Sequence, residues 1–205
     1  LGKEQWLSEV EAMHKQADVF IRVNTLKIKP EKLAEKLRAQ NIETEALDGM
    51  PNTFKLLKRA NVFSTEEYRK GFFEVQDAGS QLIVDFLDPQ SGKRVIDACA
   101  GAGGKTLQIA TQMGNKGKVI AMDVEEYKLV ELKKRVARNG IDSVEAKLIE
   151  SKTIKRLENS ADYLLLDVPC SGIGVLKRNP DAKWKLKPEF IEEIKLVQKR
   201  IITDY

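Results

Sequence analysis

The chain has 205 residues, enough for one domain of ordinary size and a small second one. With 42% hydrophobic and 32% charged residues it can bury a core, which excludes a disordered chain. No apolar stretch approaches the roughly 20 residues of a membrane span, and Leu1 opens no export signal, so we expect no membrane partner. The two cysteines, Cys99 and Cys170, are too few for a disulfide framework. They favour a reduced pair in the cytoplasm and, beside one histidine, no metal site.

The first 74 residues predict a small α+β unit. Apolar positions spaced as one helical face predict a helix over 3–17, and an alternating pattern predicts a strand over 20–28. Pro30 stands where prolines often start helices, and the helix that it opens is expected to run to residue 40. Short β-type runs follow at 44–47, 54–57 and 72–75. We therefore place a first domain at residues 1–74.

From residue 75 the pattern changes to alternating strands and helices. The strands are expected at 94–98, 118–123, 144–149 and 161–167, and the helices at 78–87, 104–113, 125–139 and 188–202. Gly114 and Gly140 lie just past two of these helices, where helix C-terminal caps favour glycine. Alternation with short loops predicts an α/β domain with a doubly wound parallel sheet over residues 75–205.

A glycine-rich turn follows the first strand of this domain. Residues 97–106 read Asp97-Ala-Cys-Ala-Gly-Ala-Gly-Gly-Lys-Thr106, and we call residues 99–105 the glycine loop. Glycines let the backbone approach a ligand, and a helix start offers free N–H groups, which predicts a nucleotide-like ligand. A Walker phosphate loop needs glycine where Cys99 stands, and a dinucleotide fingerprint needs its third glycine where Thr106 stands. S-adenosyl-L-methionine has no phosphate and needs glycines for close approach alone.

Acidic side chains stand beside the glycine loop. Asp123 ends the next predicted strand, 20 residues after Gly103. A carboxylate there can accept both hydroxyls of a ribose or cap the helix that begins near Glu125, and the two roles are compatible. Asp97 can orient the loop backbone or face the amine of a methionine. Cys99 is expected to pack inside the protein, as small thiols often do.

A second motif, Asp167-Val-Pro-Cys-Ser-Gly172, follows the run 163–166. Together the two motifs indicate a small-molecule cofactor at one strand end and a cysteine, Cys170, presented from another. From Lys177 to Lys187 the chain carries five basic residues and one acidic residue. A solvated loop would explain this charge, but its position directly after the cysteine motif favours contact with a polyanion.

These residues resemble the RNA cytosine-5 methyltransferases of the Sun, or ribosomal RNA, type. The resemblance is carried by 97–106, Asp123 and 167–172, and by further matches in the same order. These are Arg22-Val-Asn-Thr25, Val75-Gln-Asp-Ala-Gly-Ser80, and Arg178-Asn-Pro-Asp181 with Trp184. It covers residues 20–205 and implies a Rossmann-like, S-adenosylmethionine-dependent methyltransferase core with a small N-terminal RNA-binding domain.

The resemblance also implies the roles of individual residues. S-adenosyl-L-methionine would be held by Cys99, Ala100, Gly101, Ala102, Gly103, Gly104, Lys105, Asp123, Glu150 and Asp167. Glu150 stands where the family has Asp, and it can still accept from the adenine amino group. Asp167 would also serve as the acid near N3 and N4 of the cytosine. The partner is an RNA, rRNA or tRNA, contacted through Lys177, Arg178 and Lys183, and its target base must be unstacked.

The cysteines leave two hypotheses open. By the resemblance Cys170 aids release of methylated RNA, because the family's C6 nucleophile lies in a later Thr-Cys segment that residues 1–205 do not contain. In related enzymes the cysteine after proline is itself the nucleophile. We therefore expect a truncated methyltransferase with an incomplete sheet that methylates no RNA by itself. The alternative is a degenerate methyltransferase fold that binds RNA or cofactor without turnover. The target cytosine and the oligomeric state stay open.

Overall fold

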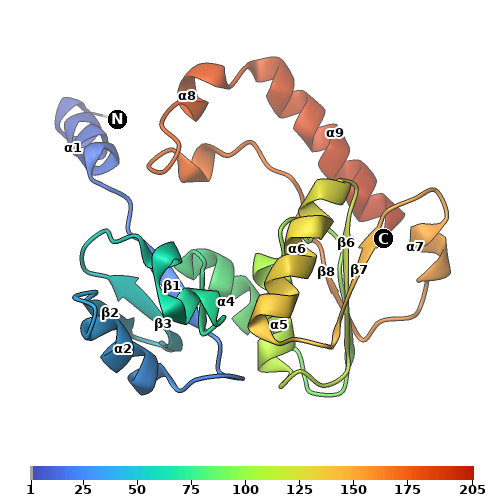
Figure 1. Ribbon diagram of the computed structural model, residues 1–205. Helices are drawn as coiled ribbons and strands as arrows, with labels where there is room; N and C mark the ends of the chain where they lie inside the picture. Colours follow the sequence, from blue (N-terminus) through green and yellow to red (C-terminus); the bar gives the residue numbers. More distant parts are fainter. Residues whose placement is uncertain (1) are drawn as a thin grey trace. The chain divides into compact units, whose positions relative to one another are not determined.

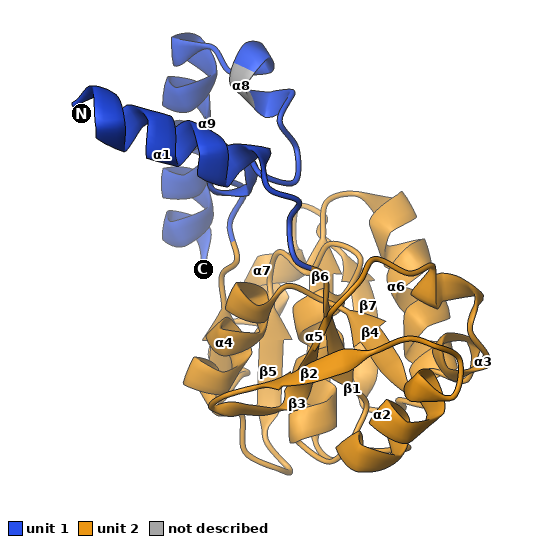
Figure 2. Ribbon diagram, turned by 90° about the vertical axis from the view of Figure 1, so that its left-hand side faces the viewer, with its two compact units in different colours: residues 1–18, 168–205 blue, residues 19–167 orange. Residues whose placement is uncertain are grey.

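The computed structural model describes residues 2–205, apart from the side chain of Lys183. Figure 1 shows the order of the helices and strands along the chain. The chain divides into two compact units, one of residues 19–167 and one of residues 1–18 and 168–205 (Figure 2). The expected domain boundary after residue 74 stays a prediction.

The larger unit begins with a four-stranded antiparallel sheet. Its strands are β1 (Phe20–Val23), β2 (Thr44–Leu47), β3 (Met50–Leu56) and β4 (Phe73–Val75), in the order β2-β3-β1-β4. Gly49, at φ 74°, closes the tight turn between β2 and β3, where a positive φ favours glycine. The helices of this region are α2 (Pro30–Arg38), the 3-10 turn η1 (Val62–Ser64) and α3 (Glu66–Arg69). The small α+β arrangement is as predicted.

The core of this sheet lies against α2. Leu33 and Leu37, one turn apart on α2, are buried in one cluster with Ile21, Phe54 and Phe73 from the strands. An apolar stripe on one helix face thereby covers one face of the sheet.

Strand β1 is shorter than predicted, because Asn24 turns the chain away. The predicted strand ran from 20 to 28, but β1 ends at Val23. The buried Asn24 amide donates to the carbonyl oxygens of Gly71 and Asn139 at 2.9 and 3.0 Å. The backbone carbonyl of Asn24 accepts from the N–H groups of Lys27 and Ile28. These partners lie far along the chain, so the alternating pattern of residues 24–28 could not reveal them.

The second sheet is parallel, as predicted. Its strands are β5 (Arg94–Asp97), β6 (Lys118–Asp123), β7 (Val144–Leu148) and β8 (Tyr163–Leu165), in the order β7-β6-β5-β8. Strand β8 is shorter than the predicted 161–167. Its last ladder partner is Asp97, after which β5 gives way to the glycine loop.

Helices cover one face of the parallel sheet. They are α4 (Ala78–Leu87), α5 (Gly104–Gln112) and α6 (Glu126–Asn139), and a short helix α7 (Thr153–Arg156) follows β7. Val95 and Val119 are in register on this face and pack with Ile109 of α5, while Leu132 of α6 packs on Ala121. Helix α6 ends at Gly140, whose φ of 68° confirms the predicted glycine cap.

The smaller unit contains α1 (Lys3–His14), the 3-10 turn η2 (Ile173–Val175), α8 (Ala182–Lys185) and α9 (Pro188–Asp204). Helix α9 begins at Pro188 and confirms the last predicted helix. Gln198 on α9 donates to the carbonyl of Pro169 at 2.7 Å, which ties the cysteine motif to this helix. Of the helices that the structure describes, none is both long and apolar enough to cross a membrane.

Candidate cofactor site

A cavity opens at the carboxyl ends of β5 and β8. Because the two strands are parallel neighbours, the residues that follow them meet at one edge of the sheet. The cavity has a volume of about 210 Å³. It is lined by Ser80, Asp97, Cys99, Ala100, Gly101, Gly104, Lys105 and Asp167. Six of these residues are among those for which the resemblance implied cofactor contact.

The two positive-φ glycines of the loop do different work. Gly101, at φ 54°, lines the cavity, and a Cβ added there would meet nothing within 4 Å. This is the open backbone that close approach of a ligand requires. Gly103, at φ 90°, instead lies against α6, where a Cβ added to it would be only 2.8 Å from Cγ of Leu132. Gly103 therefore lets α5 and α6 pack, and its contact with a cofactor stays a prediction.

Asp123 holds the glycine loop in place at the end of β6. Its Oδ2 accepts from the N–H of Gly101 at 2.9 Å, and its Oδ1 accepts from the N–H of Glu125 at 2.9 Å. The side chain is buried, yet each carboxylate oxygen has a second lone pair for another donor. Asp123 therefore combines loop support and a contact at the start of α6, and it retains acceptor capacity.

Asp97 is a buried acid with an unused oxygen. It is 1% exposed at the end of β5, and its Oδ2 accepts from the Thr106 hydroxyl at 2.7 Å. Its Oδ1 has no hydrogen-bond partner among the described residues. The pKa of Asp97 is raised from 3.8 to about 6, mainly by burial and also by the charge of Asp167. The Thr106 bond, the charge of Lys105 and the Cys99 N–H act in the opposite direction. A buried oxygen without a donor is costly, so it marks a place where a cationic ligand group would bind.

Lys105 and Asp167 form an ion pair in the cavity. Their Nζ and Oδ2 atoms lie 2.5 Å apart, with the Lys105 side chain 13% exposed and that of Asp167 44% exposed. The pair joins the start of α5 to the segment after β8. A charge-assisted bond of this kind fixes the direction of a carboxylate while leaving its second oxygen to accept.

Cys99 lines the cavity as a neutral thiol. The pKa of the Cys99 thiol is raised to about 11, mainly by burial and also by the charges of Asp97, Asp123 and Asp167. Since the thiolate is the nucleophile in cysteine chemistry, Cys99 is unreactive at neutral pH.

The other predicted site residues lie outside the cavity lining. Ala102 is exposed, and its carbonyl accepts from Arg135 at 2.8 Å. Glu150 is exposed just after β7, and its N–H donates to the Thr153 hydroxyl. Asp123 lies behind Gly101 rather than in the lining.

The predicted catalytic residue Cys170 and the predicted RNA-contact residues belong to the smaller unit. Cys170, Lys177 and Arg178 are exposed there. The side chain of Lys183, also predicted to bind RNA, lies outside the described residues. In the part of the chain that the structure describes, no group of His, Cys, Asp or Glu side chains is arranged to hold a metal ion.

One lining residue was missed by the assignment of site residues from sequence. Ser80 lines the cavity from the first turn of α4. It ends the motif Val75-Gln-Asp-Ala-Gly-Ser80, which had carried the resemblance without a role. Its position at a helix start, after a motif with no other function, was the signal available.

Models of known families match both parts of the chain. Residues 84–205 match the family described as 16S rRNA methyltransferase RsmB/F. Residues 1–63 match the ferredoxin-like domain of RsmF/B-like methyltransferases.

Individual relatives agree with these matches. A protein of Yersinia enterocolitica named ribosomal RNA small subunit methyltransferase B is 32% identical over 97% of this chain and 46% of its own length. The crystal structure of PH0851 covers 98% of this chain and 46% of its own, with 30% identity and a TM-score of 0.92. A methyltransferase homologue from Pyrococcus horikoshii covers 86% of this chain and 58% of its own, with 33% identity and a TM-score of 0.76. The chain thus spans about half the length of the curated relatives it matches.

Proposed function

The chain belongs to the 16S rRNA methyltransferase RsmB/F family, and on that premise we propose that its cavity binds S-adenosyl-L-methionine. The methyl group would pass to C5 of a cytosine in RNA, rRNA or tRNA. The observation that carries the proposal is the unpartnered Oδ1 of Asp97, buried in a cavity bordered by the open backbone of Gly101. A carboxylate oxygen there is the acceptor that the ammonium group of a methionine needs.

Different residues suit the methionine, ribose and adenine parts of the cofactor. The cavity of about 210 Å³ is smaller than the roughly 300 Å³ or more of typical cofactor pockets, so it suits the methionine end. The ribose hydroxyls would donate to the free lone pairs of Asp123, beside Gly101. Glu150 would accept from the adenine amino group on the exposed surface after β7. When bound, the cofactor supplies an electrophilic methyl group.

Asp167 would orient the target base. Cytosine C5 is a poor nucleophile until a thiolate adds to C6 and makes the ring enamine-like. A carboxyl group near N3 and N4 stabilises that adduct. Asp167 carries the required group at the cavity edge, and Lys105 fixes its direction.

Cys170 would be the thiol on the RNA side of the reaction. Cys99 is unsuited, since its pKa of about 11 keeps it protonated. We assign Cys170 the release of methylated RNA, and attack on C6 is the competing role. The exposed Lys177 and Arg178, together with Lys183, would contact the RNA backbone. A cytoplasmic location is part of this proposal, in keeping with the two reduced thiols.

Calorimetry separates the cofactor from its alternatives. We expect S-adenosylmethionine and S-adenosylhomocysteine to bind the 205-residue chain, and we expect no binding of NAD. Binding of NAD with no binding of either sulfur compound would contradict the proposal.

RNA containing 5-fluorocytosine or 5-azacytosine separates the two cysteine roles. These bases trap the nucleophile as a covalent adduct on a denaturing gel. We expect no adduct with the 205-residue chain, because its two thiols are the protonated Cys99 and the release thiol Cys170. An adduct that Cys170→Ser abolishes would make Cys170 the nucleophile. Cofactor binding without an adduct in any natural form of the protein would favour a module that binds without turnover.

A further inference from the structure

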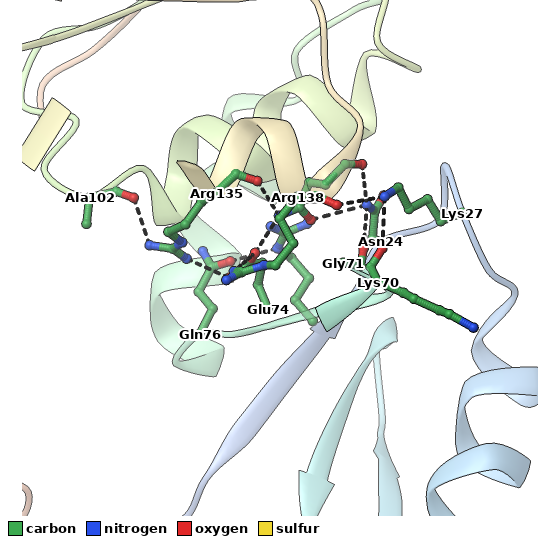
Figure 3. A network of polar contacts seen from close by, with 11 residues as sticks. Asn24, Lys27, Lys70, Gly71, Glu74, Gln76, Ala102, Arg135 and Arg138 are labelled. Carbon is green, nitrogen blue, oxygen red and sulfur yellow. Dashed lines mark hydrogen bonds and ion pairs between the residues drawn. The ribbon is translucent and has the colours of Figure 1, made fainter. Parts of the chain in front are cut away.

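One arginine of α6 connects the glycine loop to the antiparallel sheet. Arg135 donates from Nη1 to the carbonyl oxygen of Ala102 at 2.8 Å, and from Nη2 to Oε2 of Glu74 at 2.8 Å. Figure 3 shows the guanidinium between these two partners. Its two ends therefore serve two different elements at once, as a rigid planar fork can.

The anchor of this arginine is a buried carboxylate. Glu74 on β4 is 2% exposed and accepts from Arg135, Arg138 and Asn139 of α6. Burial raises the pKa of Glu74, but the charge of Arg135 and the bonds from Arg138 and Asn139 outweigh it, so the pKa lies below its usual range. Glu74 thus stays ionised at neutral pH and holds Arg135 in one orientation.

The Ala102 carbonyl is the loop's contact on this side. The residues on either side of Ala102 use their N–H groups instead. The Gly101 N–H donates to the Asp123 side chain, and the Gly103 N–H donates to the Ala100 carbonyl within the loop. Ala102 stands between two glycines with positive φ, where the backbone is free to adopt other conformations. A donor fixed to its carbonyl removes that freedom.

We propose that Arg135, held by Glu74, is a positioning residue that keeps the glycine loop in its cofactor-binding conformation. The proposal rests on cofactor binding at this loop, as proposed above. It makes the antiparallel sheet a functional part of the cofactor site, through contacts that no residue of the cavity lining supplies.

Arg138 offers a matched control on the same helix. It also donates to Glu74, and it stacks over the Tyr68 ring at 4.1 Å. Its described contacts do not include the glycine loop. Arg135→Met and Arg138→Met each remove one cation from Glu74, so a merely structural role predicts equal effects of the two substitutions on the loop.

The first readout is affinity for S-adenosylhomocysteine. We expect Arg135→Met to weaken binding about tenfold, the value of one charge-assisted hydrogen bond, and Arg138→Met to weaken it less than about twofold. The lysine of Arg135→Lys can reach only one of the two partners at a time. This variant should fold more stably than Arg135→Met but bind S-adenosylhomocysteine no more tightly. It also serves as the test variant if Arg135→Met does not fold. Equal affinity losses in the Arg135 and Arg138 variants would overturn the inference.

The second readout needs no ligand. Amide hydrogen exchange at Gly101 and Gly103 should be faster in the Arg135 variants than in the parent, and unchanged in Arg138→Met. If the parent fails to bind S-adenosylhomocysteine while this difference is seen, the proposed function is wrong, and Arg135 orders the loop without serving a cofactor. If the parent binds and exchange at the loop is the same in all variants, the positioning role is wrong and the function stands.

Discussion

Two segments that the sequence marks for function are held very differently. The glycine loop is fixed from several sides, by Asp123 on the Gly101 N–H, by Arg135 on the Ala102 carbonyl and by Leu132 against Gly103. Segment 168–187 has short helical turns, η2 and α8, and largely exposed residues between them. The proposed cofactor site is therefore formed by the fold, whereas the segment proposed to contact RNA presents mostly exposed side chains.

The difference matches the two proposed ligands. A small cofactor gains little area on binding, so its site must be formed in advance if affinity is not lost to ordering. An RNA strand contacts a protein over a long surface and is held mainly through phosphates, which exposed lysines and arginines can reach without a rigid pocket. Substitutions at the two segments should consequently differ in kind as well as in size.

The largest expected effect is at Asp123. Asp123→Ala removes the acceptor for the ribose hydroxyls, at roughly 1.5–3 kcal/mol for each charge-assisted bond. We expect at least about a 100-fold loss of affinity for S-adenosylhomocysteine by calorimetry. Asp162→Ala is the matched control, since Asp162 accepts from the Arg94 N–H at the opposite end of β5. Parent-like binding by Asp123→Ala would show that the ribose lies elsewhere.

The buried Asp97 carboxylate in the proposed cofactor site should lower the free energy of unfolding. The folded protein raises the Asp97 pKa from 3.8 to about 6, so the stability contributed by its proton is present at pH below 3.8 and is lost as the pH rises through 6. Asp97→Asn avoids this loss and can still accept from Thr106. We expect it to stabilise the fold by roughly 2–3 kcal/mol at pH 8, with little effect at pH 4, while weakening cofactor binding.

Denaturant unfolding of parent and Asp97→Asn at the two pH values measures this difference. A stability change that is the same at pH 4 and pH 8 would mean that the Asp97 charge is not the cause. A stabilised variant with undiminished affinity would remove Asp97 from the cofactor site.

The smallest effect is expected at the exposed segment. Changing Lys177, Arg178 and Lys183 to Ala should flatten the slope of log K for RNA against log salt by about 2, at about 0.7 for each phosphate contact of a single strand. The control changes Lys152, Lys155 and Arg156 to Ala, three exposed cations on and beside α7. Equal slopes for the two variants would return segment 177–187 to an ordinary solvated surface.

Local sequence patterns predicted six of the eight residues that line the cavity as cofactor contacts, and their binding of a cofactor stays a prediction. The glycine loop and Asp123 follow from their spacing along one strand-turn-helix unit, and the parallel sheet follows from the alternation of elements. The contacts of Arg135 could not be found in this way. Its partner Glu74 lies 61 residues away, on β4 of the antiparallel sheet, and neither residue belongs to a motif. The strand predicted over 20–28 was too long for the same reason, since the hydrogen-bond partners of Asn24 come from distant segments.

Amide chemical shifts during titration with S-adenosylhomocysteine test whether the cofactor site is formed within this chain. We expect saturable shifts at residues 99–105 and around Asp123, with residues 177–187 unchanged. Saturable shifts confined to other residues, or no shifts at millimolar ligand, would contradict it.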